Sequence, residues 1–334
     1  MRRFVITVGI VLFFFSCTNI QIHNFKPDSN PDYPASYYSS DTLLLSDWGY
    51  DKNDSTDILQ KALDSEYQVI IIPAKPGQWI TRPLFINRDN ITIIFEKGAQ
   101  LVAKRGSYLG KGDSVLSING VQNISIHGYG GTIRMWRDDY DNKPYEHSEW
   151  RSGIKILSSN NIQITGLIVQ ETGGDGIYIS QLRLENYPTF SSNVVIRDMQ
   201  LIDNYRQGIS VISVKNLLID NCYISGTKGT PPEAGIDFEP NKPTESFVNC
   251  KVINCEITQN NGAGILVWLK RLDAESTRVD ISIENCNIYK NGWGLGLYLG
   301  GLKNKPTGDL ILKNNKMGLI NLLPKKSIDI HNYN

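Results

Sequence analysis

One short pattern, repeated along the chain, decides the fold, and its clearest copy is Ala234-Gly235-Ile236-Asp237-Phe238-Glu239-Pro240. In a β-strand, this alternation places Ile236 and Phe238 on one face and Asp237 and Glu239 on the other. Five other segments share the glycine and the alternation that follows it: Ser152-Gly153-Ile154-Lys155-Ile156, Asp175-Gly176-Ile177-Tyr178-Ile179, Gln207-Gly208-Ile209-Ser210-Val211, Ala263-Gly264-Ile265-Leu266-Val267 and Trp293-Gly294-Leu295-Gly296-Leu297. In chain order the six glycines are 23, 32, 27, 29 and 30 residues apart.

A second motif lies between these copies and brings an asparagine and a cysteine to the same point of the repeat. Its copies are Ile219-Asp220-Asn221-Cys222-Tyr223-Ile224, Val252-Ile253-Asn254-Cys255-Glu256-Ile257 and Ile283-Glu284-Asn285-Cys286-Asn287-Ile288. Two short strands per turn and a period near 30 residues are typical of a parallel β-helix. In such a stack the asparagines bond along a bend, and we expect the cysteines to be free thiols buried in the core.

The amino-terminal residues are typical of a targeting signal. Arg2 and Arg3 precede an apolar run, and Phe14-Phe15-Ser16-Cys17 resembles a bacterial lipoprotein cleavage site. We therefore expect a signal peptide over 1–16, lipid attached to Cys17, a flexible tether over 17–44 and a β-helix domain over 45–334. This organisation predicts a protein anchored to the bacterial cell envelope.

The amino-acid composition limits the kinds of molecule that this protein is expected to bind. The 334 residues carry a formal net charge of zero, and 20% of them are charged. Since there is no basic excess, we expect no nucleic-acid partner. We expect a monomer.

The first part of the predicted domain carries a family resemblance. Asp54-Ser55-Thr56-Asp57 precedes an amphipathic run over 58–63 and predicts one helix, and Val69-Ile70-Ile71-Ile72-Pro73 follows as a buried strand. Together with Asp47-Trp48-Gly49, these residues resemble the pectate-lyase-like superfamily of right-handed parallel β-helices, which includes the polygalacturonases. The resemblance covers roughly residues 45–320 and implies an all-β solenoid whose short helix caps its amino-terminal end.

Four later stretches resemble a bacterial branch of β-helix proteins associated with polysaccharide breakdown: Ser148-Glu149-Trp150-Arg151, Gly173-Gly174-Asp175-Gly176-Ile177, Asn204-Tyr205-Arg206-Gln207-Gly208-Ile209-Ser210 and residues 234–240. The polygalacturonase pattern itself is missing. Asp175 has no adjacent Asp partner, and none of the four histidines lies in Gly-His-Gly. The resemblance therefore implies a carbohydrate substrate and transfers no catalytic residue.

Alignment of the glycines predicts one outward strip on the β-helix. Its outward side chains, with the corner residues that precede the glycines, include Lys155, Tyr178, Asp175, Gln207, Asp237, Glu239, Trp268 and Tyr298. The strip carries three carboxylates in its middle, basic residues on one side and aromatic residues on the other. We interpret Lys155 as a solvated or ion-paired residue.

This composition suits a sugar chain. We expect Asp175, Asp237 and Glu239 to be catalytic, with Glu239 or Asp237 as the acid and Asp175 as the base. The substrate-binding candidates are Glu149, Arg151, Tyr178, Arg206, Gln207, Trp268 and Tyr298; the first two lie in a polar insertion over 137–152.

Three functions fit these residues. The first is a glycoside hydrolase that needs no cofactor. The second is a polysaccharide lyase, in which the three carboxylates hold Ca²⁺ against a uronate and Arg206 removes a proton. The third is a non-catalytic glycan-binding or adhesive β-helix, which needs the aromatic side chains but not the acids.

Overall fold

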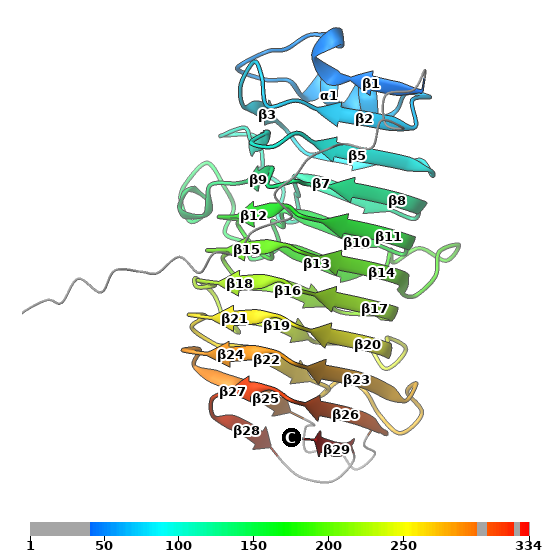
Figure 1. Ribbon diagram of the computed structural model, residues 1–334, viewed down its shortest axis with the longest axis vertical. Helices are drawn as coiled ribbons and strands as arrows, with labels where there is room; N and C mark the ends of the chain where they lie inside the picture. The colour runs from blue at the N-terminus through cyan, green and yellow to red at the C-terminus, as the bar shows by residue number, and fades with distance from the viewer. Residues whose placement is uncertain (1–40, 299–305, 324–327, 334) are drawn as a thin grey trace, which may run out of the picture.

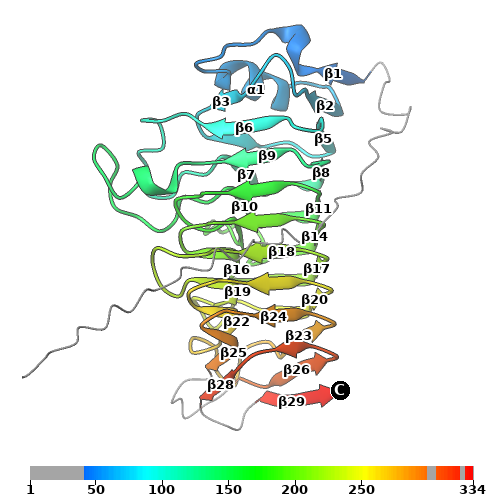
Figure 2. The same ribbon diagram turned by 60° about the vertical axis from the view of Figure 1, so that its left-hand side comes forward.

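The computed structural model describes residues 41–298, 306–323 and 328–333. Figures 1 and 2 show the strands stacked in parallel along the long axis, with the amino-terminal helix at one end. Each turn of the chain passes through three sheets, which we call A, B and C, in that order. The structure confirms the predicted parallel β-helix.

Within each sheet, every strand pairs with the equivalent strand of the adjacent turn. Sheet A contains β1 (Thr42–Leu44), β2 (Val69–Ile72), β5 (Ile91–Phe95), β8 (Gln122–His127), β11 (Asn160–Thr165), β14 (Ser191–Arg197), β17 (Val214–Asp220), β20 (Phe247–Ile253), β23 (Val279–Glu284), β26 (Gly308–Lys313) and β29 (Ile328–Tyr333). Sheet B contains β3 (Trp79–Thr81), β6 (Gln100–Ala103), β9 (Thr132–Arg134), β12 (Ile168–Gln170), β15 (Gln200–Ile202), β18 (Tyr223–Ser225), β21 (Glu256–Thr258), β24 (Asn287–Tyr289) and β27 (Lys316–Met317). Sheet C contains β4 (Leu84–Ile86), β7 (Leu116–Asn119), β10 (Ile154–Leu157), β13 (Ile177–Ser180), β16 (Gln207–Val211), β19 (Ala234–Phe238), β22 (Ala263–Trp268), β25 (Trp293–Tyr298) and β28 (Ile320–Leu323).

The predicted count of two strands per turn is wrong, because each turn has three. The asparagine–cysteine motif spans a corner between two strands: Asp220 ends β17, and Tyr223 begins β18. Asn221 makes this corner with a φ of 51°, a left-handed conformation that asparagine tolerates better than most residues. Most sheet B strands have only three residues, which is too short for alternation to separate them from the strand before.

The glycine-containing strands align in sheet C as the repeat predicts. A column of core side chains runs through the register in the order Ile154, Ile177, Ile209, Ile236, Ile265 and Leu295, and all six are completely buried. On the opposite face the same register pairs Lys155 with Tyr178 and Ser210 with Asp237. The strip of aligned outward positions is therefore present.

The glycines themselves are required by close packing between turns. A Cβ atom at Gly208 would lie 2.5 Å from the carbonyl oxygen of Gly235, and one at Gly235 would lie 2.6 Å from that of Gly264. Gly176 meets the carbonyl oxygen of Gly208 in the same way, at 2.6 Å. Any side chain at these positions would push neighbouring turns apart, which explains why the glycine recurs in each copy.

The three aligned cysteines, Cys222, Cys255 and Cys286, are buried and free, as expected. Stacked amides also support the corners. Asn314 Nδ2 donates to Asn285 Oδ1 at 3.3 Å, whereas Asn221 and Asn254 donate to the aspartates Asp198 and Asp220.

The amino-terminal end is closed by α1 (Thr56–Leu63), the predicted helix, and by the 3-10 helix η2 (Leu45–Trp48). Strand β1 already pairs with β2, so the first turn begins at Thr42, three residues before the expected domain start. Cys17 and the predicted signal peptide lie outside the described residues. Among the described residues, no helix has the length and apolar character needed to cross a membrane.

Candidate active site

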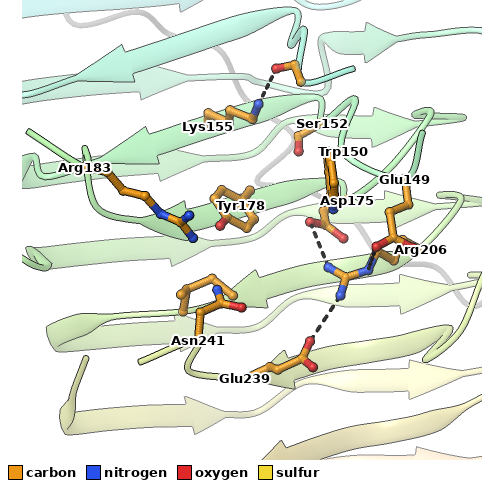
Figure 3. Close-up of a pocket in the computed structure, with 12 residues that line it drawn as sticks. Glu149, Trp150, Ser152, Lys155, Asp175, Tyr178, Arg183, Arg206, Glu239 and Asn241 are labelled. Carbon is orange, nitrogen blue, oxygen red and sulfur yellow. Dashed lines mark hydrogen bonds and ion pairs between the residues drawn. The ribbon is translucent and has the colours of Figure 1, made fainter. Parts of the chain in front are cut away.

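Arg206 is the centre of the candidate site. It lies in the turn before β16, and its guanidinium meets three carboxylates from separate parts of the chain (Figure 3). Nη2 donates to Glu239 Oε2 at 3.1 Å, Nη1 lies 3.8 Å from Asp175 Oδ2, and Nε lies 3.8 Å from Glu149 Oε1. Because one guanidinium joins Asp175 and Glu239, their nearest oxygens are no more than roughly 9 Å apart.

Asp175 has the most unusual environment of the three carboxylates. Its side chain is almost completely buried, and its Oδ1 atom has no hydrogen-bond partner among the described residues. Burial raises the pKa of Asp175 to about 7, although Arg206 and Lys155 oppose the rise. Asp175 can therefore gain or lose a proton near neutral pH, as a general acid or base must.

Arg206 keeps its charge. Burial alone would lower the pKa of Arg206, but the surrounding carboxylates, Asp175 and Glu239 above all, raise it. Its guanidinium forms a charge-assisted hydrogen bond with Glu239, whose side chain is partly exposed. The arrangement places a buried acid and a partly exposed carboxylate on two sides of one cation.

Asp237 does not line the cavity, contrary to its prediction as a catalytic carboxylate open to the groove. It is on the predicted face, but it is completely buried. Gln207 Nε2 donates to Asp237 Oδ2 at 2.8 Å, and Gln207 Oε1 accepts the backbone N–H of Ala234 at 3.0 Å. Burial, together with the Glu239 charge, raises the pKa of Asp237 well above its usual range. Gln207 is also completely buried. This pair therefore lies beneath the surface of the site and cannot contact a substrate.

The three carboxylates around Arg206, those of Glu149, Asp175 and Glu239, line a pocket of about 450 Å³ on sheet C (Figure 3). Its walls include Glu149, Tyr178, Arg206 and Glu239, which confirms that these predicted site residues lie together. The other lining residues are Gly112, Trp150, Ser152, Lys155, Asp175, Arg183, Ile212 and Asn241.

The polar insertion over 137–152 begins with the 3-10 helix η3 (Arg137–Asp139). As expected, its later residues fold over one end of this pocket. Its contacts reach the turn that carries Arg206. Arg137 Nη1 donates to the Asp203 carbonyl oxygen at 2.9 Å, and the Tyr205 hydroxyl donates to Asp141 Oδ1 at 3.0 Å. The insertion thereby holds Glu149 beside Arg206.

Arg151 is an anchor of the insertion, which corrects its prediction as a substrate-binding residue. Its side chain is completely buried. Nε donates to the Tyr108 carbonyl oxygen at 2.8 Å, and Nη2 donates to the Glu146 carbonyl oxygen at 2.8 Å. The charge faces backbone carbonyls instead of the pocket, because the loop closes around it.

A second pocket of about 520 Å³ continues from the first along the axis. Arg206 and Glu239 line both pockets, so the two form one groove. Trp268 and Tyr298, predicted as sugar-binding residues, line the second pocket with ring centroids 4.7 Å apart. From β10 to β25 the groove crosses five strand spacings, about 24 Å.

Several lining residues could not be found from the sequence, since they lie in loops without a repeat. Arg183 and Asn241 follow β13 and β19, and Trp150 lies in the insertion. The Asn241 loop is fixed by the buried carboxylate of Glu245, which accepts the Gln181 side-chain amide at 2.7 Å and the Lys242 backbone N–H at 3.1 Å. Lys155 was interpreted as solvated or ion-paired; it lies in the pocket wall, and its Nζ donates to the Gly112 carbonyl oxygen.

Two of the three expected Ca²⁺ ligands, Asp175 and Glu239, contact Arg206, whereas the third, Asp237, accepts a hydrogen bond from Gln207. Within the described ranges, no group of three His, Cys, Asp or Glu side chains is placed to hold a metal ion. The guanidinium of Arg206 supplies a positive charge between Asp175 and Glu239.

A family of β-helix proteins matches the central part of this chain. The family described as "Right handed beta helix region" matches residues 106–242 and 185–279, which together cover more than half of the chain. The chain belongs to the right-handed β-helix family. The fold and this match are consistent with the resemblance to the pectate-lyase-like superfamily.

The known proteins that are similar to this chain differ from it widely in sequence. The SPbeta prophage-derived uncharacterized protein YorA of Bacillus subtilis (strain 168) is 27% identical over 162 residues, which is 45% of this chain and 27% of that protein. The chain thus spans about a quarter of this relative's length.

Two solved structures share the fold. The Dettilon tailspike protein is 12% identical, with a TM-score of 0.58 over 82% of this chain and 50% of that one. A 4-galactohydrolase of 1,3-α-1,4-β-D-galactose-4-sulfate-3,6-anhydro-D-galactose-2-sulfate is 12% identical, with a TM-score of 0.57 over 90% of this chain and 89% of that one. At these identities, the likeness establishes the fold alone.

Proposed function

We propose that this protein is a glycoside hydrolase that cleaves a polysaccharide or oligosaccharide in the groove of sheet C. The observation that carries the proposal is the Arg206-centred cluster, in which an Asp with a pKa of about 7 and a partly exposed Glu line one pocket. The fold shared with a galactohydrolase supports a carbohydrate substrate.

Asp175 is the general acid in this proposal, and Glu239 is the base, which reverses the expected roles. The protonated Asp175 gives its proton to the glycosidic oxygen as the bond from that oxygen to the anomeric carbon breaks. Glu239 takes a proton from water, and the water oxygen forms the new bond to the anomeric carbon. The upper bound of roughly 9 Å on the separation of their nearest oxygens is compatible with the 5–5.5 Å typical of retaining enzymes and with most of the 6.5–9.5 Å typical of inverting enzymes, and direct attack by water is the inverting route.

The second pocket supplies the binding surface. Trp268 and Tyr298 offer ring faces against which a pyranose can stack, next to Glu239 and Arg206. A sugar chain lying along the axis would contact the aromatic rings and pass the carboxylates at its scissile bond.

We also propose that the protein is anchored to the envelope through lipid on Cys17, which would place the groove near glycans outside the cytoplasm. Mass spectrometry of the protein extracted from its native membrane would detect a diacylated Cys17. An unmodified amino terminus beyond residue 17 would contradict the anchor.

The test of the function is a screen of plant, algal and host glycans for release of new reducing ends. Glu239→Gln should abolish turnover, whereas Glu275→Gln, at an exposed carboxylate that lines neither pocket, should not change it. An unsaturated product that absorbs in the ultraviolet would favour the lyase instead. Binding without turnover in the wild type would favour the adhesive β-helix.

A further inference from the structure

We propose that Asp237 is a neutral carboxylic acid whose O–H group donates a hydrogen bond to Glu239 and thereby positions that carboxylate. Asp237 is a positioning residue in this account, because it is buried and does not contact the substrate. The positioning role rests on the proposed function, in which Glu239 activates water. The protonation of Asp237 and its contact with Glu239 do not depend on that function.

Gln207 fixes the direction of the hydrogen bonds around Asp237. Because its Oε1 atom accepts the backbone N–H of Ala234 at 3.0 Å, the amide turns its NH₂ group toward Asp237. That group donates to Asp237 Oδ2 at 2.8 Å. Oδ2 is thus an acceptor, which leaves Oδ1 as the oxygen that can carry a proton.

The surroundings of Asp237 suit a neutral acid better than an ionised one. Its Oδ1 atom is buried and accepts no hydrogen bond from any described residue. Within the described part of the chain Asp237 also has no salt bridge, unlike the three carboxylates around Arg206. An ionised Asp237 would have a single neutral donor, the Gln207 amide, to replace the water lost on burial. A neutral Asp237 needs one acceptor instead.

The groups that face Asp237 come from the neighbouring turns and from its own strand. The turn before β16 brings Arg206, and β22 on the other side brings the apolar Leu266. The nearby carboxyls are those of Glu239, just after the same strand, and of Asp175, before β13. Burial raises the pKa of Asp237 well above its usual range, and the Glu239 charge adds to the rise, which Arg206 only opposes.

Glu239 is the acceptor that a neutral Asp237 needs. It lies two residues further along the chain, and the two carboxyl groups are within hydrogen-bonding reach of each other. Two carboxyl oxygens this close need a proton between them, since two ionised groups would repel. Glu239 is partly exposed and accepts a hydrogen bond from Arg206 Nη2 at 3.1 Å, whereas Asp237 has neither advantage (Figure 3). The proton therefore belongs to Asp237.

Two donors then hold Glu239 from different groups. The Arg206 guanidinium and the Asp237 O–H together restrict the rotation of the carboxylate, so that it is oriented before a substrate binds. A negative charge on Asp237 would repel Glu239 instead of holding it. Asp237 keeps its proton throughout the reaction and takes no part in proton transfer.

Infrared spectroscopy of the protein alone tests the protonation, because a protonated carboxyl group has a C=O stretching band that an ionised one lacks. Spectra are recorded at pH 7 in an Asp175→Asn background, which removes the contribution of Asp175 itself. The band should be present, and Asp237→Asn, which keeps the shape of the side chain, should remove it. Glu239→Gln should shift the band, since a neutral amide oxygen is a weaker acceptor than a carboxylate. Glu275→Gln should leave it unchanged.

Turnover of the glycan that the screen selects tests the positioning role, in protein that keeps Asp175. Asp237→Ala should lower kcat about ten- to a hundredfold with little change in KM, because Glu239 loses a charge-assisted hydrogen bond and the substrate loses no contact. Asp237→Asn, whose amide donates in place of the O–H group, should recover most of this loss. Rates are expressed per folded molecule, so that a loss of stability does not count as a loss of kcat.

A missing band, or one that Asp237→Asn leaves in place, would overturn the neutral acid. A band that Glu239→Gln does not shift would overturn the contact between the two carboxyls. A kcat for Asp237→Asn as low as that for Asp175→Asn would overturn the positioning role. If no glycan is turned over, the proposed function fails together with that role, whereas the infrared spectra still decide the protonation of Asp237.

Discussion

At the scale of single residues, the protonation of Asp175 controls the proposed chemistry. Because the acid must carry its proton, the rate should fall as the pH rises through about 7, the pKa to which burial raises this group. Asp175→Asn cannot donate a proton and should lower kcat by roughly 10²–10⁴. Initial rates from pH 5 to 9 test both expectations, and a wild-type rate that increases above pH 7 would contradict the acid role.

The same shift predicts a change of stability with pH. The folded-state pKa of about 7 is above the usual 3.8, so the folded protein binds more protons than the unfolded chain between these values. Wild-type stability should therefore fall, relative to Asp175→Asn, as the pH rises from about 4 to 7, by at most about 4 kcal/mol. Urea unfolding of both proteins at pH 5 and pH 8 measures the difference, and identical pH dependence would contradict the burial of an ionisable group here.

How far the sequence predicts the site is also decided residue by residue. Alternation and spacing found Asp175, Tyr178, Arg206 and Glu239, because these follow the register of the repeat. The same alternation predicted that Asp237 lies on the outward face, but it could not predict that Asp237 is buried, since its contact with Gln207 joins two turns of the β-helix. Arg183 carries no periodic signal, because the loop that presents it occurs once.

At the scale of elements, the insertion depends on Arg151. Arg151→Ala should destabilise the folded protein by roughly 3 kcal/mol, because buried carbonyls lose their donor. It should also lower activity by releasing Glu149 from Arg206. Limited proteolysis would detect faster cleavage within residues 141–150, and Glu149→Gln serves as the control that keeps the anchor. An Arg151→Ala protein with normal stability and a raised KM alone would restore the substrate-binding role.

The glycines of sheet C hold adjacent turns at their close spacing. Gly235→Ala places a methyl group against the carbonyl oxygen of Gly264 and against Ile257, and should cost about 1–3 kcal/mol of stability. Gly296→Ala faces side-chain atoms at 3.0 Å or more and should cost less. Thermal unfolding ranks the two variants, and an equal loss would contradict steric contact between turns as the cause.

Corners and strands differ in how well the sequence predicts them. The glycine strands of sheet C were predicted because the same apolar column repeats in six copies. The sheet B strands were not separated from those of sheet A, since one left-handed residue such as Asn221 is all that divides them. Short strands therefore merged into one motif, and the predicted number of strands per turn was too low.

At the scale of the whole molecule, the groove extends along the axis, so binding and chemistry lie on different turns. Trp268→Ala should raise KM about tenfold with little change in kcat, because the ring stacks on a sugar away from the scissile bond. Trp268→Phe, which keeps an aromatic face, should recover most of the loss. A large fall in kcat with unchanged KM would contradict this separation of roles.

The central claim is that the carboxylates around Arg206 add water across a glycosidic bond. Mass spectrometry of the products from the glycan that the screen selects tests it most directly. The account predicts that the wild-type products together exceed the substrate by one molecule of water, and that Asp175→Asn forms them at least a hundredfold more slowly. Products that sum to the substrate mass without water, or equal product formation by Asp175→Asn, would contradict it.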